Sequence, residues 1–195
     1  MLWHSGAVTA TIPPTQLTLR PWRPGDAGAV LAAFAGSDMA TQSGEPIIDL
    51  AGARRWLDWP MSLAGSGTGY AFAVTLDADE PVANVALSNI DRHGCGWVSY
   101  WTAERVRGRG IASSALVAAV AWWHDIAGIP RLELGYRLNN PGSASVAASA
   151  GFIVEGRQRG KLCYDGVRYD VETAARLDAD PRPAARHPSL VIGHD

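Results

Sequence analysis

The residues with the clearest chemical potential lie in one short run, Arg105 to Ser113, which reads RVRGRGIAS. Two glycines, Gly108 and Gly110, alternate with arginines immediately before a stretch of helical composition. The first amides of a helix have no acceptor within that helix, and the helix dipole at that end favours negative charge. Because glycine lets a bulky anion approach the main chain, the run predicts a cradle for a diphosphate group.

Elements on both sides must position this run. Upstream, the runs 70–75, 81–90 and 96–102 are separated by turns at 77–80 and 91–94, which predicts three sequential strands. Downstream, residues 111–126 carry apolar side chains at helical spacing, and 131–136 follows as a strand. Near the N-terminus, a strand over 17–22 precedes a helix that is capped by Asp26 and ends near Phe34. A second helix follows Asp49 over 51–63, and Pro60 should kink or end it.

The last part of the domain contains a short helix and a hairpin. The helix over 142–150 ends at Gly151, and Asp165-Gly166 joins two strands that contain 152–155 and 168–174. The order of elements predicts an α+β fold, a mostly antiparallel mixed sheet flanked by helices, with one right-handed crossover. The domain should cover 15–177, with an N-terminal extension over 1–14 and a tail rich in Pro, Ala and charge over 178–195.

Composition narrows the class of protein. The 195 residues are 47% hydrophobic and 18% charged, which suits one folded domain. The net charge of −2 gives no support for nucleic-acid binding. No apolar stretch reaches the roughly 18 residues of a membrane span, and 1–10 lacks the pattern of a secretory signal. Cys95 and Cys163 fit no metal motif. We therefore expect a cytoplasmic protein with reduced thiols and with no metal, nucleic-acid or membrane partner.

Two motifs carry a resemblance to a known family. The run Tyr100–Ala112 resembles motif A of the GNAT acyltransferases, whose core Arg-x-x-Gly-x-Gly is met by Arg105, Gly108 and Gly110. The stretch 140–146, followed by Ala150-Gly151-Phe152, resembles motif B, in which an Asn and a Ser precede a short helix ending in Gly-Phe. Segments 17–26, 155–157 and 164–170 are similar to the RimJ/RimL-like branch, the ribosomal-protein N-terminal acetyltransferases. The resemblance covers about 15–177 and implies a single-domain acyl-CoA N-acyltransferase fold.

The resemblance implies acetyl-CoA as the donor of an acetyl group and an amine as its acceptor. It implies that the amides of 107–112 hold the diphosphate and that the pantetheine arm pairs with strand 99–102 as an added strand would. Asn140 would hydrogen-bond that arm, and Ser143 would lie near the thioester sulfur. The expected donor-binding residues are Trp101, Thr102, Arg105, Arg107, Gly108, Arg109, Gly110, Ile111, Ala112, Asn140 and Ser143.

Direct acetyl transfer requires a neutral amine, a main-chain N–H for the oxyanion and a thiolate leaving group. An α-amine with a pKa of about 7.7–8.0 is roughly one-seventh neutral near neutral pH, whereas the neutral fraction of a lysine is lower by a few hundredfold. A protein N-terminus therefore needs only a weak base. Glu133 is the candidate catalytic base, or else a strand residue that is salt-bridged to Arg105 or Arg137. Ser143 is the candidate proton donor to the thiolate, or else a helix cap.

The remaining aromatic candidates have two interpretations each. Many GNAT members carry a tyrosine general acid four residues before the Gly of Gly-Phe, and here that position is Ala147. Tyr100 and Tyr136 are the substitutes for that acid, or else they are strand aromatics. Trp56 and Trp59, three residues apart on a predicted helix, either line the acceptor channel or pack in the core.

Several functions compete with N-acetylation of a protein N-terminus. The spacing Gly108-x-Gly110-x-x-Ser113, with Glu133 about 20 residues later, superficially matches a dinucleotide fingerprint. The third glycine is absent, however, and the meander before it is not a parallel βαβ unit. The alternatives are acetylation of a small amine, such as an antibiotic, polyamine or amino acid, and a non-catalytic CoA-binding module. An exposed tryptophan from the adjacent pair at 122–123 would suit a homodimer contact.

Overall fold

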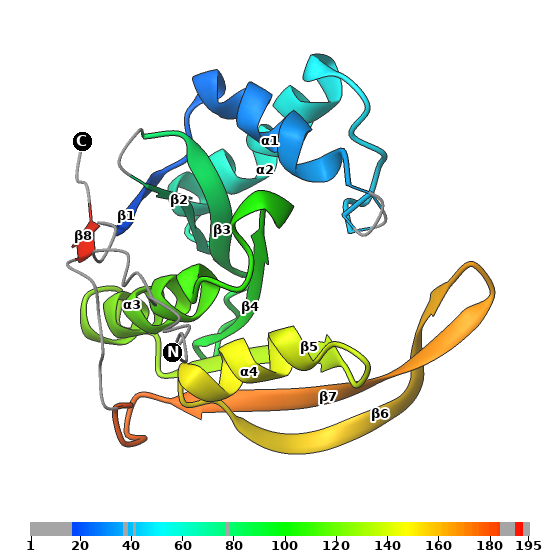
Figure 1. Cartoon of the computed structure of the whole chain (residues 1–195). Coiled ribbons are helices and arrows are strands. Elements are labelled where there is room, and N and C mark those ends of the chain that lie inside the picture. The colour runs from blue at the N-terminus through cyan, green and yellow to red at the C-terminus, as the bar shows by residue number, and fades with distance from the viewer. Residues whose placement is uncertain (1–16, 37–38, 41, 77–78, 184–189, 193–195) are drawn as a thin grey trace, which may run out of the picture.

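The fold is built on one mixed eight-stranded sheet. The structure, a computed structural model, describes residues 17–36, 39–40, 42–76, 79–183 and 190–192. Figure 1 shows the sheet in the order β6-β7-β5-β4-β3-β2-β1-β8. Neighbouring strands are antiparallel except for the parallel pairs β4–β5 and β1–β8. The predicted α+β class with a mostly antiparallel sheet is confirmed. The strands are β1 (Leu17–Pro21), β2 (Tyr70–Thr75), β3 (Pro81–Ser88), β4 (Cys95–Thr102), β5 (Arg131–Arg137), β6 (Ile153–Tyr164), β7 (Val167–Leu177) and β8 (Leu190–Ile192).

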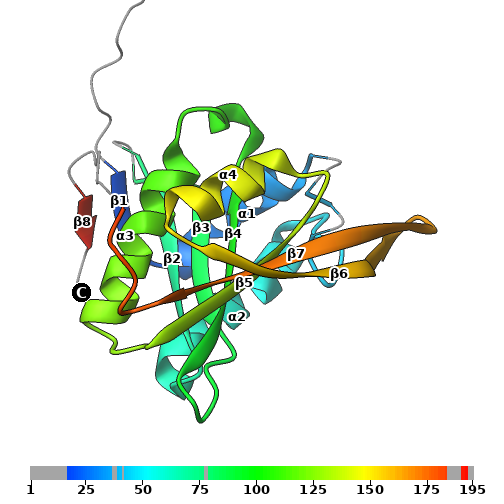
Figure 2. The ribbon, with the colours of Figure 1, turned by 90° about the horizontal axis from the view of Figure 1, so that it is seen from below.

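Helices cover both faces of this sheet. Figure 2 places α4 on one side of the sheet and α2 on the other. The pair α1 (Ala27–Phe34) and α2 (Leu50–Ser66) packs together on one face, and α3 (Ile111–Asp125) and α4 (Pro141–Ser149) pack together on the other. Short 3-10 turns, η1 (Pro24–Asp26) and η2 (Glu104–Val106), precede α1 and α3. The helices cover the two faces of the sheet, so the chain at the ends of β4 and β5 shapes the region around the glycine run.

The predicted second helix does not stop at Pro60. Asp49 caps it as expected, accepting a hydrogen bond from the amide of Gly52 at 2.7 Å, but the helix continues to Ser66. Proline removes one main-chain donor, and Pro60 itself is buried on the same helix face as Leu57 and Leu63. Burial of that apolar face offsets the missing hydrogen bond, so the helix gains one further turn.

The adjacent tryptophans of α3 both pack inside the molecule. Trp123 is fully buried, and Trp122 packs edge-on against Tyr70 and Phe72 of β2, with ring centroids 5.0 and 5.3 Å away. The small residue Ala119 lets α3 approach the sheet closely and is itself fully buried. The pair therefore presents no exposed ring to suggest a dimer contact.

The last two long strands form a hairpin that extends beyond the rest of the sheet. Asp165 and Gly166 form its turn with positive φ angles of 49° and 78°, as the predicted hairpin signal requires. The pairing of β6 with β7 is interrupted between Gln158 and Leu162, where Gly160 has a φ of 58°. Such an irregularity increases the local twist, and Figure 1 shows the hairpin curving away from the body of the protein.

The predicted C-terminal tail contributes to the fold. Arg182 pairs with Asp125 at the end of α3, at 2.5 Å. Further along the chain, β8 adds to β1 in parallel, with Leu17 opposite Leu190. The predicted N-terminal extension, 1–14, lies outside the described residues.

Candidate active site

The central feature of the site is the divergence of β4 and β5. These parallel strands pair at only three positions, the last of which joins Trp97 to Glu133. Beyond that point β4 continues for five residues to Thr102 and β5 for four residues to Arg137. Figure 1 shows the two strands separating. We call the region between the diverging ends of β4 and β5 the split.

One edge of β4 is open along the split. The amide of Ala103 donates to the carbonyl of Val82 in β3, and alternate residues of a strand direct their main-chain groups to opposite edges. By this alternation Ser99 and Trp101 bond to β3, whereas the main-chain groups of Tyr100 and Thr102 face the split. An extended chain can add to such an edge. This edge therefore fits the predicted position of a pantetheine arm.

The glycine run forms an open turn at the wide end of the split. Gly108 and Gly110 have φ angles of 74° and 75°, and Gly110 is the N-cap of α3. The first helical hydrogen bond runs from the amide of Ser114 to the carbonyl of Gly110. The amides of 111–113 thus have no acceptor within the helix. A Cβ added to either glycine would meet nothing within 4 Å, so the space in front of these amides is open to an anion. The turn fits a diphosphate group.

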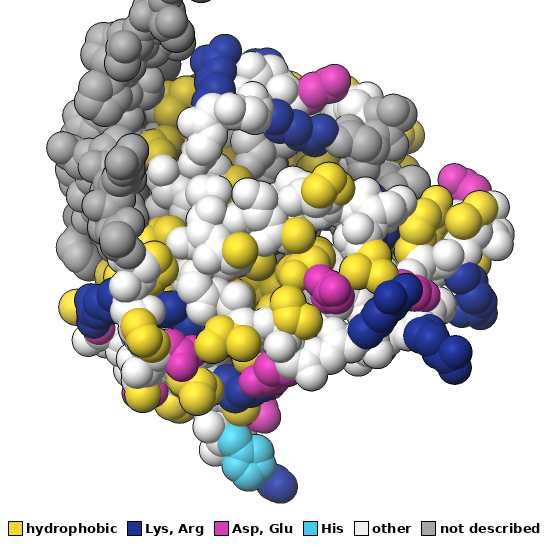
Figure 3. Space-filling view, turned by 60° about the horizontal axis from the view of Figure 1, so that its bottom comes forward, with side chains coloured by type: hydrophobic (Ala, Val, Ile, Leu, Met, Phe, Trp, Pro, Cys, Tyr) yellow, Lys and Arg dark blue, Asp and Glu magenta, His cyan; other side chains and the backbone are white. Residues whose placement is uncertain are grey.

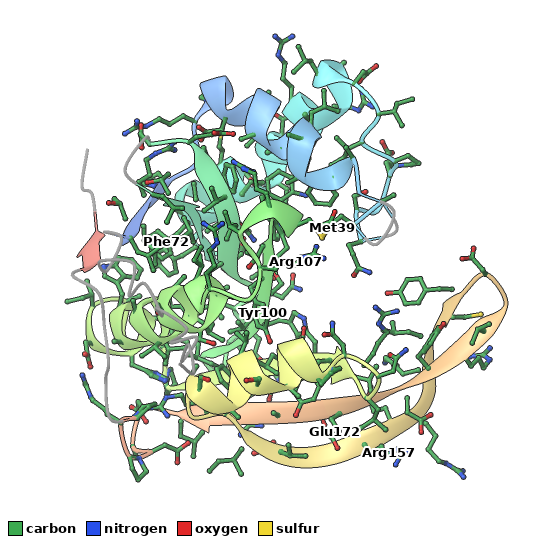
Figure 4. The ribbon with its side chains drawn as sticks, in the orientation of Figure 1. Met39, Phe72, Tyr100, Arg107, Arg157 and Glu172 are labelled. Atoms are coloured by element: carbon green, nitrogen blue, oxygen red, sulfur yellow. The ribbon has the colours of Figure 1, made fainter. Side chains whose placement is uncertain are left out.

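The three arginines of the run have different surroundings. Arg105 forms an ion pair with Glu80 at 2.9 Å, which ties η2 to the start of β3. Arg107 donates from Nε to the carbonyl of Thr102 at 3.0 Å and so braces the end of β4. Arg109 is exposed beside the turn. Figure 4 shows Arg107 and Tyr100 in this region. The geometry favours Arg107 and Arg109 over Arg105 as partners of a phosphate.

The start of α4 lies against the other side of the split. Asn140 caps α4, and its Oδ1 accepts a hydrogen bond from the amide of Ser143 at 3.1 Å. The carbonyl of Ser143 accepts a hydrogen bond from the hydroxyl of Tyr100 at 2.9 Å. The predicted donor-site residues Asn140 and Ser143 are therefore brought to the same strand as the open edge. The side-chain amide of Asn140 keeps its two N–H donors for a further partner.

The end of α4 explains the Gly-Phe pair. Gly151 has a φ of 78°, and the amide of Phe152 closes the helix by donating to the carbonyl of Ala147 at 3.1 Å. A Cβ on Gly151 would collide with the guanidinium of the buried Arg176. Ala147 is 1% exposed and is packed in the core. The position that carries a tyrosine acid in many family members is thus a packing residue here.

Two tyrosines and one carboxylate gather between β4, β5 and β7. Burial raises the pKa of Tyr100 to about 12. Burial, and then a hydrogen bond with the Glu172 carboxylate, raises the pKa of Tyr136. Both phenols therefore keep their protons at neutral pH. The hydroxyl proton of Tyr100 is held by the Ser143 carbonyl and that of Tyr136 by the Glu172 carboxylate. Ser143 is therefore the hydroxyl group to consider for proton donation.

Glu133 lies at the closed end of the split. It is the last residue of β5 that pairs with β4. Its Oε1 accepts from Nε of Arg131 at 2.7 Å, and Arg131 also pairs with Glu155 at 2.6 Å. The partner is Arg131 rather than the predicted Arg105 or Arg137. Its role as a base stays a prediction.

Aromatic rings line the opposite face of β4. Trp101 contacts Trp22, Phe34 and Trp56, with ring centroids 5.6–6.0 Å away. Trp59 extends this group from α2, 6.3 Å from Trp56, and is 40% exposed. The predicted pair on α2 is thus placed beside the split. Trp22 and Phe34 were not among the predicted site residues. The period-two alternation of β4 predicts only that Trp101 and Tyr100 lie on opposite faces of the strand.

A surface depression outside the split is lined by polar groups that bond to one another. It measures about 380 Å³ and is lined by Arg20, Asp26 and Asp79, among others. Arg20 donates to both carboxylates and to the carbonyls of Pro21 and Asp79. The groups of this network satisfy one another, and it braces β1 against η1 and the turn before β3. None of the described helices is long and apolar enough to cross a membrane. Within the described ranges no group of three acidic, His or Cys residues is placed to hold a metal.

Comparison with known proteins agrees with this geometry. The model of the acetyltransferase (GNAT) domain matches residues 16–153. The ribosomal-protein-serine acetyltransferase of Escherichia coli (strain K12) is 29% identical over 111 residues, 56% of this chain and 62% of that protein. The chain thus aligns with about three-fifths of that relative.

Solved structures show the same fold. The ribosomal-protein-S5-alanine acetyltransferase of Vibrio fischeri has a TM-score of 0.74 at 22% identity, covering 85% of this chain and 94% of that one. Mycobacterium smegmatis RimJ, solved with a CoA-disulfide, has a TM-score of 0.74 at 24% identity, covering 84% and 85%. The divergence of β4 and β5, the glycine turn and the matched model lead to one conclusion: the chain belongs to the acetyltransferase (GNAT) domain family.

Proposed function

We propose that this protein transfers the acetyl group of acetyl-CoA to the α-amine at the N-terminus of a protein. The observation that supports an α-amine as the acceptor is that the two carboxylates beside the split already have bonding partners. Glu133 is held by Arg131, and Glu172 is hydrogen-bonded to Tyr136. Each of these two carboxylates thus already has a neighbouring partner. An α-amine suits such a site, because with a pKa of about 7.7–8.0 a useful fraction is already neutral. Similarity to ribosomal-protein acetyltransferases supports the same choice. A cytoplasmic location is part of this proposal.

The donor is held by main-chain groups for the most part. The amides of 111–113 bind the diphosphate at the helix N-terminus, with Arg107 and Arg109 beside it. The open edge of β4 at Tyr100 and at the amide of Thr102 pairs with the pantetheine arm, and Asn140 donates to it from α4. The thioester carbonyl then lies near the main-chain N–H groups of β4, which can stabilise the oxyanion.

The protein's own side chains make a small contribution to proton transfer. The attacking amine loses its proton to water that Glu133 polarises through its free oxygen, and Ser143 is the proposed proton donor to the departing thiolate. Positioning provides most of the rate. Removing either group should therefore lower kcat far less than removing the nucleophile of a covalent enzyme would.

Acetyl-CoA turnover with a panel of amines tests the proposal. The panel contains peptides with a free N-terminus, the same peptides with a blocked N-terminus and one lysine, polyamines, amino acids and an aminoglycoside. We expect thiol release and N-terminal acetylation, detected by mass spectrometry, with the free N-termini only. Preferred turnover of a small amine would replace the protein acceptor. Tight CoA binding without turnover of any amine would indicate a non-catalytic module. A thermal shift with NADH but not with acetyl-CoA would contradict the donor site itself.

A further inference from the structure

Arg137 and Trp101 occupy equivalent positions on the two sides of the split. The last paired residues are Trp97 and Glu133, and Trp101 and Arg137 each lie four residues further along their strands. Side chains alternate with a period of two, so both residues project to the face that α1 and α2 cover. Each lies about 13 Å along its strand from the last pair, at 3.3 Å per residue. An acceptor that enters from this face passes between them.

The β6–β7 hairpin holds the guanidinium of Arg137. Its Cζ atom lies 5.2 Å from the ring centroid of Tyr164 and 5.3 Å from that of Tyr169. The two ring centroids are 6.0 Å apart, so the three centres form a nearly equilateral triangle. The guanidinium therefore caps a notch between two rings. Cation–π contacts of this kind restrain an arginine while leaving its N–H groups unused.

No carboxylate neutralises Arg137 within the part of the chain that the structure describes. Its cross-strand neighbour in β7 is Val171. The acidic residues beside it in β7, Asp170 and Glu172, lie at even positions, on the opposite face. Asp170 is bound by Arg157 and by the amide of Gly160, and Glu172 by Tyr136. No hydrogen bond or ion pair to the guanidinium of Arg137 is found among the described residues, and a guanidinium has five N–H donors.

The β6–β7 hairpin carries positively charged side chains, as Arg137 does. Arg159 and Lys161 are exposed in the irregular stretch of β6. Figure 3 shows Lys and Arg side chains gathered towards the hairpin end of the molecule. This positive charge lies on a chain whose net charge is −2. A local positive field attracts an anionic ligand.

We propose that Arg137 is the anion-binding residue of the acceptor site and binds a carboxylate that the acceptor carries within a few residues of its amine. The inference rests on the proposed function and narrows its acceptor class. Two donor hydrogens of a guanidinium can meet both oxygens of a carboxylate, which fixes direction as well as charge. The carboxylate comes either from an Asp or Glu side chain near a protein N-terminus or from the α-carboxylate of a small amino acid.

Matched acceptors distinguish the two sources. One series is a C-amidated tetrapeptide with a single Asp or Asn at position 1, 2, 3 or 4, and the other is an amino acid or dipeptide with a free or an amidated carboxyl group. For the preferred pair, the wild-type protein should show a kcat/KM about tenfold higher with the carboxylate, the scale of one charge-assisted contact. Arg137→Gln should erase this ratio, and Arg137→Lys should retain part of it. Arg92→Gln, at an exposed arginine in the turn between β3 and β4, should leave the ratio unchanged.

Binding separates failure of this inference from failure of the proposed function. The Kd of each carboxylate and carboxamide acceptor for the CoA-loaded protein, followed by tryptophan fluorescence, requires no turnover. Turnover with equal kcat/KM and equal Kd for every Asp and Asn pair would overturn the role of Arg137 and leave the acetyltransferase proposal intact. A preference that survives in Arg137→Gln would also overturn it. Absence of turnover with a tenfold difference in Kd that Arg137→Gln removes would overturn the catalytic proposal and support the anion site.

Discussion

Substitution of Gly110 by valine tests the diphosphate cradle directly. Gly110 has a φ of 75°, a conformation that costs a residue with a Cβ about 1–2 kcal/mol. For a domain of this size that strain lowers Tm by roughly 2–8 °C. A Cβ at this position meets nothing within 4 Å in the protein, so the substitution causes no steric clash of its own. The strain is present with and without ligand and does not by itself change CoA affinity.

The effect on affinity comes from the space in front of the helix. The valine side chain would occupy the region that the amides of 111–113 face. Loss of one hydrogen bond to a charged group costs about 1.5–3 kcal/mol, which weakens CoA binding by roughly 10- to 100-fold. Binding of phosphopantetheine, which lacks the diphosphate, should change much less because its contacts lie along β4.

Gly166→Val provides the control for strain. Gly166 has a φ of 78°, and a Cβ there also meets nothing within 4 Å, but it lies at the tip of the β6–β7 hairpin. Calorimetric titration with CoA and with phosphopantetheine, together with thermal unfolding, separates the two effects. Both variants should lose a similar amount of stability, and only Gly110→Val should lose CoA affinity. Equal CoA affinity in wild type and in a folded Gly110→Val would refute the cradle.

Three further predictions concern the elements around the split. Asn140→Asp keeps the cap of α4 but removes the amide donors, so denaturant unfolding should be nearly unchanged while CoA binding weakens several-fold. Asn140→Ala should in addition lower the unfolding free energy by about 1 kcal/mol. Tyr100→Phe should also cost about 1 kcal/mol in chemical denaturation by leaving the Ser143 carbonyl without its donor. Because the pKa of Tyr100 is raised to about 12, this variant should leave the pH–rate profile below pH 9 unchanged, and a lost limb would assign Tyr100 a catalytic proton. The amide of Gly160 and the Arg157 guanidinium hold the pKa of Asp170 below its ordinary value, so its contribution is complete above about pH 4 and is lost as the pH falls through the lower, folded value. Unfolding free energies at pH 6 and pH 3 should therefore differ less in Asp170→Asn than in wild type, and an equal difference would contradict this role.

Local patterns in the sequence were sufficient for most elements of the fold. An apolar run followed by a turn places β2 at Tyr70–Thr75, the predicted residues, and helical spacing places α3 from Ile111. The Asn140 cap and the Gly151 terminus of α4 also follow from residue type, because they depend on hydrogen bonds within one turn. For the same reason the proposed donor site could be predicted from the sequence, since a glycine turn and a helix N-terminus are local features.

Side-chain contacts between different strands of the sheet could not be predicted from local sequence patterns. The partner of Glu133 is two residues away in β5, yet the choice of Arg131 over Arg137 depends on the β5–β7 register and on Glu155 in β6. The notch that holds Arg137 requires an irregular pairing in β6, and Gly160 alone does not predict where the strand resumes its pairing. The proposed acceptor side depends on such contacts, which is why sequence alone left the acceptor open.

The pairing of β1 with β8 has a consequence for biosynthesis. These strands are adjacent in the sheet, although Leu17 and Leu190 lie at opposite ends of the chain. During synthesis the outer edge of β1 stays unpaired until residues 190–192 have left the ribosome, about 10–35 s later at 5–20 residues per second. An unpaired strand edge is a template for association with other chains. A nascent chain, or one truncated before residue 190, therefore has an exposed edge that β8 covers once it pairs, and the solubility of such a chain in the cell depends on that strand.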